Sequence, residues 1–342
     1  MADLVLAEGP LLSAILEQTY SIWCEGLTPM AYDRFYSAQL ATPWGRGHLR
    51  RFALVDAADL LASAKEYSFA AVLDGQSVRV VGLGAVFTNP AHRGRGVARD
   101  LIERMLARAT EGGADLALLF SEIGADYYAR SGFEAIHAKE LTLRVKESDR
   151  RGAPATLVRA ATEDDLADIV AMGETRAAPF RFHLVRDRDL VHYATSKKRL
   201  LAGLGPAGMR ELQLFVAEEG ASAAAYAAIT TLRSAGVSNG RDCVGNHLRG
   251  VPTTWILEEC GDRDPSGARV GAILQTLIAR DPAEPRPQII AWLPAGFRPP
   301  QIAVADERPT SEMMMVRALS ARARAAMPLR AEDVLFWHTD VF

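Results

Sequence analysis

The chain has 342 residues, of which 49% are hydrophobic and 24% charged, and it carries a formal net charge of −3 with a pI near 6.2. This is the composition of a globular protein, and the length favours two domains over one. The slight acidity argues against a general nucleic-acid binder, which would be basic, and no apolar run of about eighteen residues predicts a membrane span.

The amino-terminal residues lack the basic start and apolar core of a signal peptide. Three widely spaced cysteines without a Cys-x-x-Cys pair fit a reducing compartment, so we expect a cytoplasmic protein. Seven scattered histidines show no ligand spacing, and we predict no metal site.

Hydrophobic periodicity predicts alternating strands and helices over residues 1–145. A strand at 3–7 and two helices at 11–23 and 30–40 come first. Strands follow at 51–55, 69–73 and 77–87, and Asp74-Gly75 between the last two is typical of a tight hairpin. The remaining predicted elements are a helix that opens within 88–102, a buried strand at 116–120, a helix that ends near 131, and strands at 133–137 and 140–145.

The turn within residues 88–102 joins a strand to an amphipathic helix and is rich in arginine and glycine. Free N–H groups of a helix's first turn favour an anion, and Gly94 and Gly96 allow a phosphate to approach the backbone. Arg93 and Arg95 add positive charge. The residues therefore predict a site for a diphosphate-bearing ligand. The sequence has neither a P-loop motif nor the dinucleotide fingerprint with its acidic residue.

Two motifs, Arg93-x-x-Gly96-x-Ala98 and Tyr128-x-x-x-Gly132-Phe133, resemble the acyl-CoA signature and the tyrosine element of the GNAT superfamily of N-acetyltransferases. Residues 42–47, 85–98 and 120–133 further resemble the lysine N6-acetyltransferase-like family of fungi and bacteria. This resemblance covers about residues 5–145. It implies the acetyltransferase fold, an α/β (α+β) architecture with a mixed central sheet flanked by helices, and acetyl-CoA as cosubstrate.

A polar segment with glycine and proline at 146–155 is interpreted as a linker between a domain at 1–145 and a second at 156–342. The second half restarts with a strand and a helix, where Thr162 and Asp165 resemble a capping box. Strands near 213–217, 222–232, 253–259 and 288–293 and a helix at 267–280 follow. Only Gly267-Ala-Arg-Val-Gly271 faintly resembles the Arg/Gly turn, so we interpret this half as a degenerate acetyltransferase-like domain without CoA. An unrelated α/β domain is the alternative.

The resemblance also implies which residues contact CoA. The strand before the Arg/Gly turn is expected to separate from its neighbour and to bind the pantetheine and the thioester oxygen, while the turn binds the pyrophosphate. The implied contacts are Val86, Phe87, Thr88, Arg93, Gly94, Arg95, Gly96, Val97 and Ala98.

The resemblance assigns Tyr128 the role of general acid that protonates the departing thiolate, whereas the neighbouring Tyr127 is expected in the core. Glu122 follows the buried strand at 116–120, where it could accept the proton of the amine. Two alternatives stay open for Glu122: a carboxylate that favours a helix dipole, or a water chain that replaces any single base.

An amino-acid substrate needs a group that holds its carboxylate. The segment Trp44-Gly-Arg46 is one candidate wall, although packing is the favoured role of Trp44. In the second half, one predicted strand carries three further candidates: Trp255, Glu258 and Glu259. Because successive side chains of a strand point to opposite faces, they cannot all lie in one cleft. The last candidates are His338, Asp340 and the Phe342 carboxylate. We expect these residues to form an exposed, frayed tail.

Together these observations predict a soluble acyltransferase that moves an acetyl group from acetyl-CoA to a primary amine of a small molecule, with the side chain of free lysine favoured. An aminoglycoside, a polyamine or a protein is the alternative acceptor, and a non-catalytic CoA-binding sensor is the alternative function. We expect no nucleic-acid or membrane partner, and the oligomeric state is left open.

Overall fold

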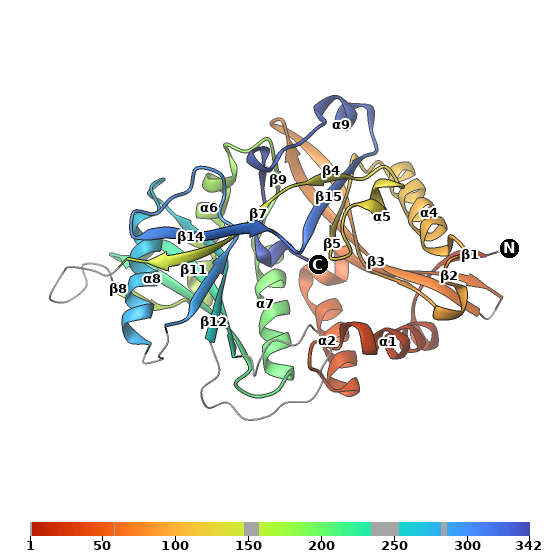
Figure 1. Ribbon diagram of the computed structural model, residues 1–342, viewed down its shortest axis with the longest axis horizontal. Helices are drawn as coiled ribbons and strands as arrows, with labels where there is room; N and C mark the ends of the chain where they lie inside the picture. Colours follow the sequence, from red (N-terminus) through yellow and green to blue (C-terminus); the bar gives the residue numbers. More distant parts are fainter. Residues whose placement is uncertain (1, 58, 147–156, 234–252, 282–285) are drawn as a thin grey trace.

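The computed structural model describes residues 2–57, 59–146, 157–233, 253–281 and 286–342. Within these residues the strands form two mixed sheets, one of nine strands and one of seven, with helices packed against them (Figure 1). The end of the chain lies near the centre of the molecule, between the two halves (Figure 1). The predicted α/β class with a mixed sheet flanked by helices is confirmed.

The first half follows the predicted order with one short helix, α3, added. Its elements are β1 (Asp3–Leu6), α1 (Gly9–Trp23), α2 (Pro29–Ala41), α3 (Pro43–His48), β2 (Leu49–Asp56), β3 (Asp59–Leu73), β4 (Gln76–Thr88), η1 (Pro90–His92), α4 (Val97–Glu111), β5 (Leu116–Ser121), α5 (Asp126–Ala129), β6 (Glu134–Ile136) and β7 (Lys139–Val145).

Local sequence explains several of these elements. Asp74 and Gly75 both have positive φ, 50° and 74°, as the predicted tight hairpin between β3 and β4 requires. The apolar stripe of α4 is buried against the sheet. Thr42 accepts a hydrogen bond from the Gly45 N–H at 3.0 Å and so caps α3, a helix too short and too glycine-rich to be predicted from periodicity.

The second half contains the predicted strands and helices and several elements that were not predicted. Its elements are β8 (Leu157–Ala160), η2 (Glu163–Asp165), α6 (Leu166–Ala177), β9 (Phe182–Leu184), α7 (Arg188–Leu204), β10 (Arg210–Glu219), β11 (Ser222–Arg233), β12 (Thr253–Asp262), α8 (Ala268–Arg280), β13 (Gln288–Ala291), β14 (Ile302–Pro309), β15 (Met313–Ala318), α9 (Ala321–Ala326), η3 (Ala331–Asp333), β16 (Val334–Leu335) and η4 (His338–Asp340). The predicted capping box of Thr162 and Asp165 is present.

The two halves share strands. The first sheet includes β9, β15 and β16 of the second half, with β9 paired to β3 and β16 to β9, and the second sheet includes β7 of the first half. The first sheet has the order β1-β2-β3-β4-β5-β15-β6, so β15 of the second half lies between β5 and β6. The second sheet has the order β14-β7-β13-β12-β11-β10-β8, so β7 of the first half lies between β13 and β14. The predicted division at residue 145 therefore does not separate the two sheets. The predicted linker at 146–155 lies outside the described residues except for Lys146.

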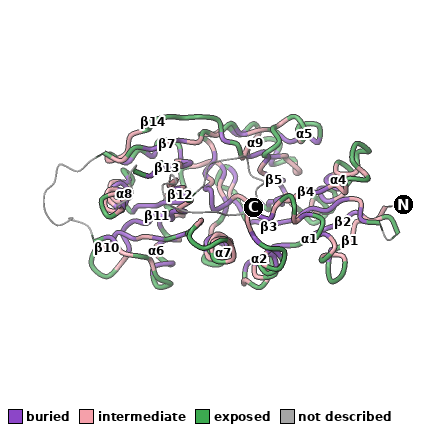
Figure 2. Tube along the Cα trace, turned by 60° about the horizontal axis from the view of Figure 1, so that its bottom comes forward, coloured by how far each residue is buried: buried purple, intermediate pink, exposed green. Residues whose placement is uncertain are grey.

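One apolar cluster also joins the halves. It packs Trp44 and Phe69 of the first half against Phe182, Tyr193 and Val334 of the second. Buried residues follow the central strands of both halves, whereas the outer helices, the turns and the edge strand β14 carry exposed residues (Figure 2). None of the described helices is long and apolar enough to cross a lipid bilayer.

We expect Val316→Asp to lower the free energy of unfolding by at least about 3 kcal/mol, because it would bury an unpaired charge between β5 and β6. Val316 is 2% exposed and pairs with Leu118 and Glu134. Val304→Asp on β14, where the side chain is 40% exposed, is the matched control and should change the stability by less than about 0.5 kcal/mol. Urea denaturation followed by circular dichroism measures both, and equal stabilities would contradict the exchanged position of β15.

Candidate functional site

The Arg/Gly turn leads from β4 into α4 and presents its backbone to open space. Gly94 and Gly96 both have φ of 76°, a left-handed conformation that favours glycine. A Cβ built on either residue meets no atom within 4 Å. Among the described residues no side chain caps the first turn of α4, and Arg93 and Arg95 are exposed beside it. An uncapped helix start with two arginines is suited to bind an anion.

The predicted separation of β4 from its neighbour is visible in the strand pairing. The parallel ladder between β4 and β5 runs from Val80–Leu116 to Gly82–Leu118, although β4 continues to Thr88 and β5 to Ser121. A bulge with φ of 47° at Ala85 interrupts the pairing of β4 with β3 just beyond this point. The residues expected to contact CoA, 86–88, follow the bulge. Their role in binding stays a prediction.

Tyr128 lies on the short helix α5 that follows β5. Its ring packs edge to face on Phe133, with the ring centroids 6.2 Å apart, and it joins the apolar cluster beneath α4. Tyr127 is 39% exposed, so the expectation that it is the core residue of the pair is wrong. Burial, followed by Tyr127 and the charge of Glu122, raises the pKa of Tyr128 to about 12. The phenol therefore keeps its proton at neutral pH, as a general acid must.

Glu122 is exposed where β5 ends, and its charge acts on Tyr128. The neighbouring strand β15 begins here, because Met313 pairs with Ser121. Glu312, which precedes β15, has a raised pKa because of its burial, and the charge of Glu122 raises that pKa further. The exchanged strand thus brings a second carboxyl group from the other half toward Glu122.

The last residues of the chain pack on the face of the first sheet that α2 covers. The Phe342 ring lies 4.5 Å from Tyr67, 5.3 Å from Phe69 and 5.4 Å from Phe120 between centroids. Gly82 lacks a side chain where the ring approaches, since a Cβ there would lie 2.6 Å from the Phe342 Cζ. The expectation of an exposed, frayed tail is therefore wrong.

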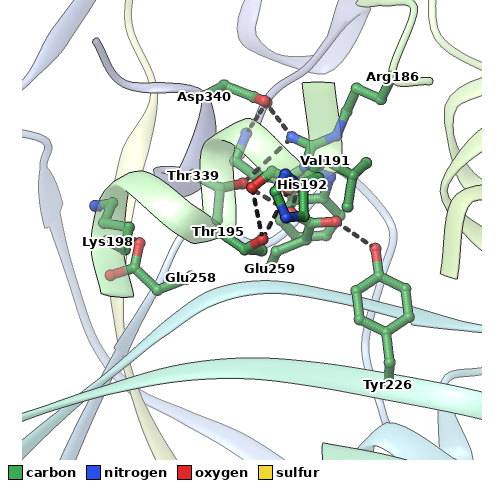
Figure 3. Close-up of polar contacts among 11 residues, drawn as sticks. Arg186, Val191, His192, Thr195, Lys198, Tyr226, Glu258, Glu259, Thr339 and Asp340 are labelled. Carbon is green, nitrogen blue, oxygen red and sulfur yellow. Dashed lines mark hydrogen bonds and ion pairs between the residues drawn. The ribbon is translucent and has the colours of Figure 1, made fainter. Parts of the chain in front are cut away.

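Buried polar contacts fix the segment before Phe342 to the second half (Figure 3). The Arg186 guanidinium forms ion pairs with both Asp340 and Glu259. Glu259 also accepts hydrogen bonds from the Thr339 hydroxyl at 2.7 Å and the Tyr226 hydroxyl at 2.6 Å. Every charge in this group has a partner, so the network serves to hold the segment in place.

Among the other residues considered from the sequence, His338, Trp44 and Trp255 pack against their neighbours, whereas Arg46 is exposed. His338 stacks on Trp292 with centroids 3.8 Å apart, and burial lowers the pKa of His338 to about 4, so the imidazole is neutral. Trp44 is buried against Phe69 and Tyr193, which confirms packing as its role. The remaining side chains considered are Arg46, which is exposed and donates to the Ala41 carbonyl, and Trp255, which is in the core of the second half.

Arg51 on β2 and Lys65 on β3 are two cationic residues that sequence reasoning missed. Arg51 is 2% exposed, and its Nε and Nη1 have no hydrogen-bond partner in the described part of the chain. Burial, followed by the charges of Arg51 and Lys197, lowers the pKa of Lys65 to about 7. The sequence pattern could have indicated the burial of Arg51. Leu49, Arg51 and Ala53 are two positions apart on an apolar strand and therefore lie on the same, inward face.

The second half has a matching helix start at α8, but it is filled. A Cβ on Gly267 would collide with Phe297 and lie 3.1 Å from Pro299. The Asp262 carboxylate accepts a hydrogen bond from the Arg269 N–H in the first turn at 2.8 Å. An internal carboxylate and an aromatic ring thus occupy the position that stays open at α4.

Comparisons with known proteins concern the family and the fold. The family model described as acetyltransferase (GNAT) domain matches residues 33–136. No curated protein matches the sequence. The fold is similar to that of a probable N-acyltransferase from Enterococcus faecalis V583, at 13% identity and a TM-score of 0.64, over 94% of this chain and 74% of that one.

Two further structures have the same fold. A GCN5-related N-acetyltransferase from Kribbella flavida has 18% identity and a TM-score of 0.61, over 94% of this chain and 72% of that one. The N-myristoyltransferase of Saccharomyces cerevisiae, solved with bound myristoyl-CoA, has 10% identity and a TM-score of 0.54, over 92% and 82%. These matches span both halves, which confirms the predicted fold. The chain carries an acetyltransferase (GNAT) domain at residues 33–136, and it is an enzyme of the predicted acyltransferase class.

Proposed function

We propose that this protein transfers an acetyl group from acetyl-CoA to a primary amine of a small molecule. The observation that carries the proposal is the position of the gap between β4 and β5, which opens beyond Gly82 and Leu118. The open Arg/Gly turn follows β4, and Tyr128 follows β5. A ligand with a diphosphate at one end and a thioester at the other fits such an arrangement.

The residues of the turn fit the pyrophosphate of CoA. The α4 first turn offers uncapped N–H groups, and the open space over Gly94 and Gly96 leaves room for phosphate oxygens. Arg93 and Arg95 would neutralise part of the charge. When bound, acetyl-CoA supplies a thioester carbonyl that an amine can attack.

In the transfer a C–N bond forms, the C–S bond breaks, one proton leaves the amine nitrogen and one reaches the sulfur. Tyr128 would donate the proton to the sulfur, because its raised pKa keeps the phenol protonated. The proton of the amine would pass to Glu122 or to water. The exposed position of Glu122 is compatible with both routes.

Free lysine is the acceptor that we favour, through its side-chain amine, because residues 42–47, 85–98 and 120–133 resemble the lysine N6-acetyltransferase-like family. An aminoglycoside, a polyamine or a protein would use the same chemistry. A CoA-binding sensor is the non-enzymatic alternative. A panel of these amines, with detection of the free thiol of released CoA, distinguishes them, and turnover with none of the amines would favour the sensor.

We expect one molecule of acetyl-CoA to bind per chain, because Phe297 and the Asp262 carboxylate fill the helix start of the second half. Isothermal titration calorimetry should give a stoichiometry near one. A stoichiometry near two would mean that the second half also binds CoA.

We expect Gly96→Glu to weaken acetyl-CoA binding at least about tenfold more than Gly96→Gln does, since only the first places a negative charge at the diphosphate position. Both variants place a side chain at φ of 76° and carry the same backbone strain, so Gly96→Gln is a matched control. Calorimetry measures the affinities and thermal unfolding checks the fold. Equal affinities would show that the turn only starts a helix.

We expect Tyr128→Phe to lower kcat by about 10²–10⁴-fold while acetyl-CoA still binds, because the ring packs as before and only the acidic proton is lost. Tyr127→Phe, which alters the exposed neighbour, is the control and should retain its activity. Because the pKa of Tyr128 is about 12, wild-type kcat should not fall through loss of this proton below about pH 10. Steady-state kinetics across this range test both points, and wild-type turnover by Tyr128→Phe would refute the assignment.

A further inference from the structure

Arg51 and Lys65 lie directly opposite each other on adjacent strands. The register pairs Arg51 of β2 with Lys65 of β3, and Lys65 in turn with Gly84 of β4. The side chains of Arg51 and Lys65 both reach the ring of Tyr36 on α2, at 5.9 Å from the Arg51 Cζ and 5.3 Å from the Lys65 Nζ. Two cations therefore share one face of the sheet, under α2.

Neither cation has a carboxylate partner in the described residues. The Arg51 Nη2 reaches the Ser63 Oγ at 3.4 Å, and the other two guanidinium nitrogens have no partner. No ion pair involves Lys65 within the same residues. Lys197 is a third cation close enough to lower the pKa of Lys65, and its Nζ donates to the Val341 carbonyl. Arg186, which is also buried, differs because it has two carboxylates.

This arrangement costs stability. Like charges directly opposite in a sheet repel, and a buried charge without a partner is expensive. The lowered pKa of Lys65 reflects the same cost, since burial and the neighbouring cations both disfavour its charged form. An anion bound between the two side chains would offset the repulsion and complete the hydrogen bonds of Arg51. The side chain of Lys65 is partly exposed, whereas the Arg51 nitrogens that lack a partner are buried, so a ligand reaches the pair from the Lys65 side.

The pair is one strand away from the proposed reaction centre. Gly84, the partner of Lys65, precedes the bulge at Ala85, and at this level β4 has already separated from β5. Gly84 presents no side chain, and a Cβ there would lie 3.0 Å from the Phe342 backbone oxygen and 3.2 Å from the Tyr67 ring. Phe342 and Tyr67 therefore fill the space over Gly84, and an acceptor bound at Lys65 has to reach the bulge beside the last residue of the chain.

Building on the proposed acetyl transfer, we infer that Arg51 and Lys65 bind the carboxylate of the acceptor and direct its amine toward the gap between β4 and β5. The substrate class is then an amino carboxylate, such as an amino acid. Polyamines and aminoglycosides carry only positive charge, and the same two cations repel them.

The test compares L-lysine with cadaverine, which has the same carbon chain and amines but no carboxylate. Wild type is expected to show a higher kcat/KM for lysine. Lys65→Met and Arg51→Met should each reduce the ratio of the two kcat/KM values by about tenfold or more, mainly through the KM for lysine, because a charge-assisted hydrogen bond is lost. Arg50→Met is the matched control: Arg50 is the exposed neighbour of Arg51 on β2, and this variant should leave the ratio unchanged.

The outcomes separate this inference from the proposed function. Turnover of amines with no preference for lysine, or an unchanged ratio in Lys65→Met, would overturn the carboxylate site and leave the acetyltransferase intact. An equal fall in kcat for both amines would also overturn it, since that result would place Lys65 in the chemistry instead of in carboxylate binding.

If wild type acetylates no amine, the proposed function fails, and direct binding then tests the site. Calorimetry with 6-aminohexanoate should show binding to wild type and none to Lys65→Met, and absence of binding to wild type would overturn the site. A second readout is the melting temperature without ligand. Lys65→Met should raise it, because the variant removes a repelling charge, whereas a lowered melting temperature would assign Lys65 a structural role and overturn the inference.

Discussion

The exchange of β7 and β15 is the constraint on which the rest of the molecule depends. Each sheet includes strands of both halves, so neither half can form its complete sheet alone. Because β15 pairs with the whole length of β5, the chain lies at the first sheet where β15 ends. From there α9 and β16 carry it back toward the middle of the molecule, where Phe342 reaches Gly82. The second half therefore contributes to the surroundings of the candidate site although its own helix start is filled.

Sequence reasoning succeeded where the signal is local. The Asp74-Gly75 hairpin, the glycine conformations of the Arg/Gly turn and the apolar stripe of α4 each depend on a few neighbouring residues, and the structure has all three. The strand exchange depends on pairing between residues about 190 positions apart, such as Met313 and Ser121. The hydrophobic pattern of an apolar strand such as β15 is the same whichever sheet the strand joins. Periodicity therefore could not show which of the two sheets contains β15.

The candidate site was predictable only in part, for a similar reason. The Arg/Gly turn and Tyr128 stand out through their spacing, but the roles of charged residues depend on partners distant in sequence. Glu258 and Glu259 are adjacent, and a regular strand would turn them to opposite faces. A bulge in the pairing of β12 with β11 falls at Glu258, and both carboxylates are buried with partners, Thr230 for Glu258 and Tyr226 for Glu259. Neither the bulge nor the partners can be inferred from the sequence around them.

The two helix starts show how the halves have come to differ. At α4 no described side chain caps the positive end of the helix, which costs some stability and leaves the helix start open to the anion of the proposed ligand. At α8 the chain supplies its own anion, Asp262, and packs Phe297 over Gly267. Arg186 and Arg51 repeat this contrast: one buried guanidinium is satisfied by two carboxylates, and the other lacks an anion. In both comparisons the unsatisfied group belongs to the first half. In the proposed function, the satisfied charges Arg186 and Asp262 hold the fold of the second half, and the unsatisfied groups at α4 and Arg51 select the ligand.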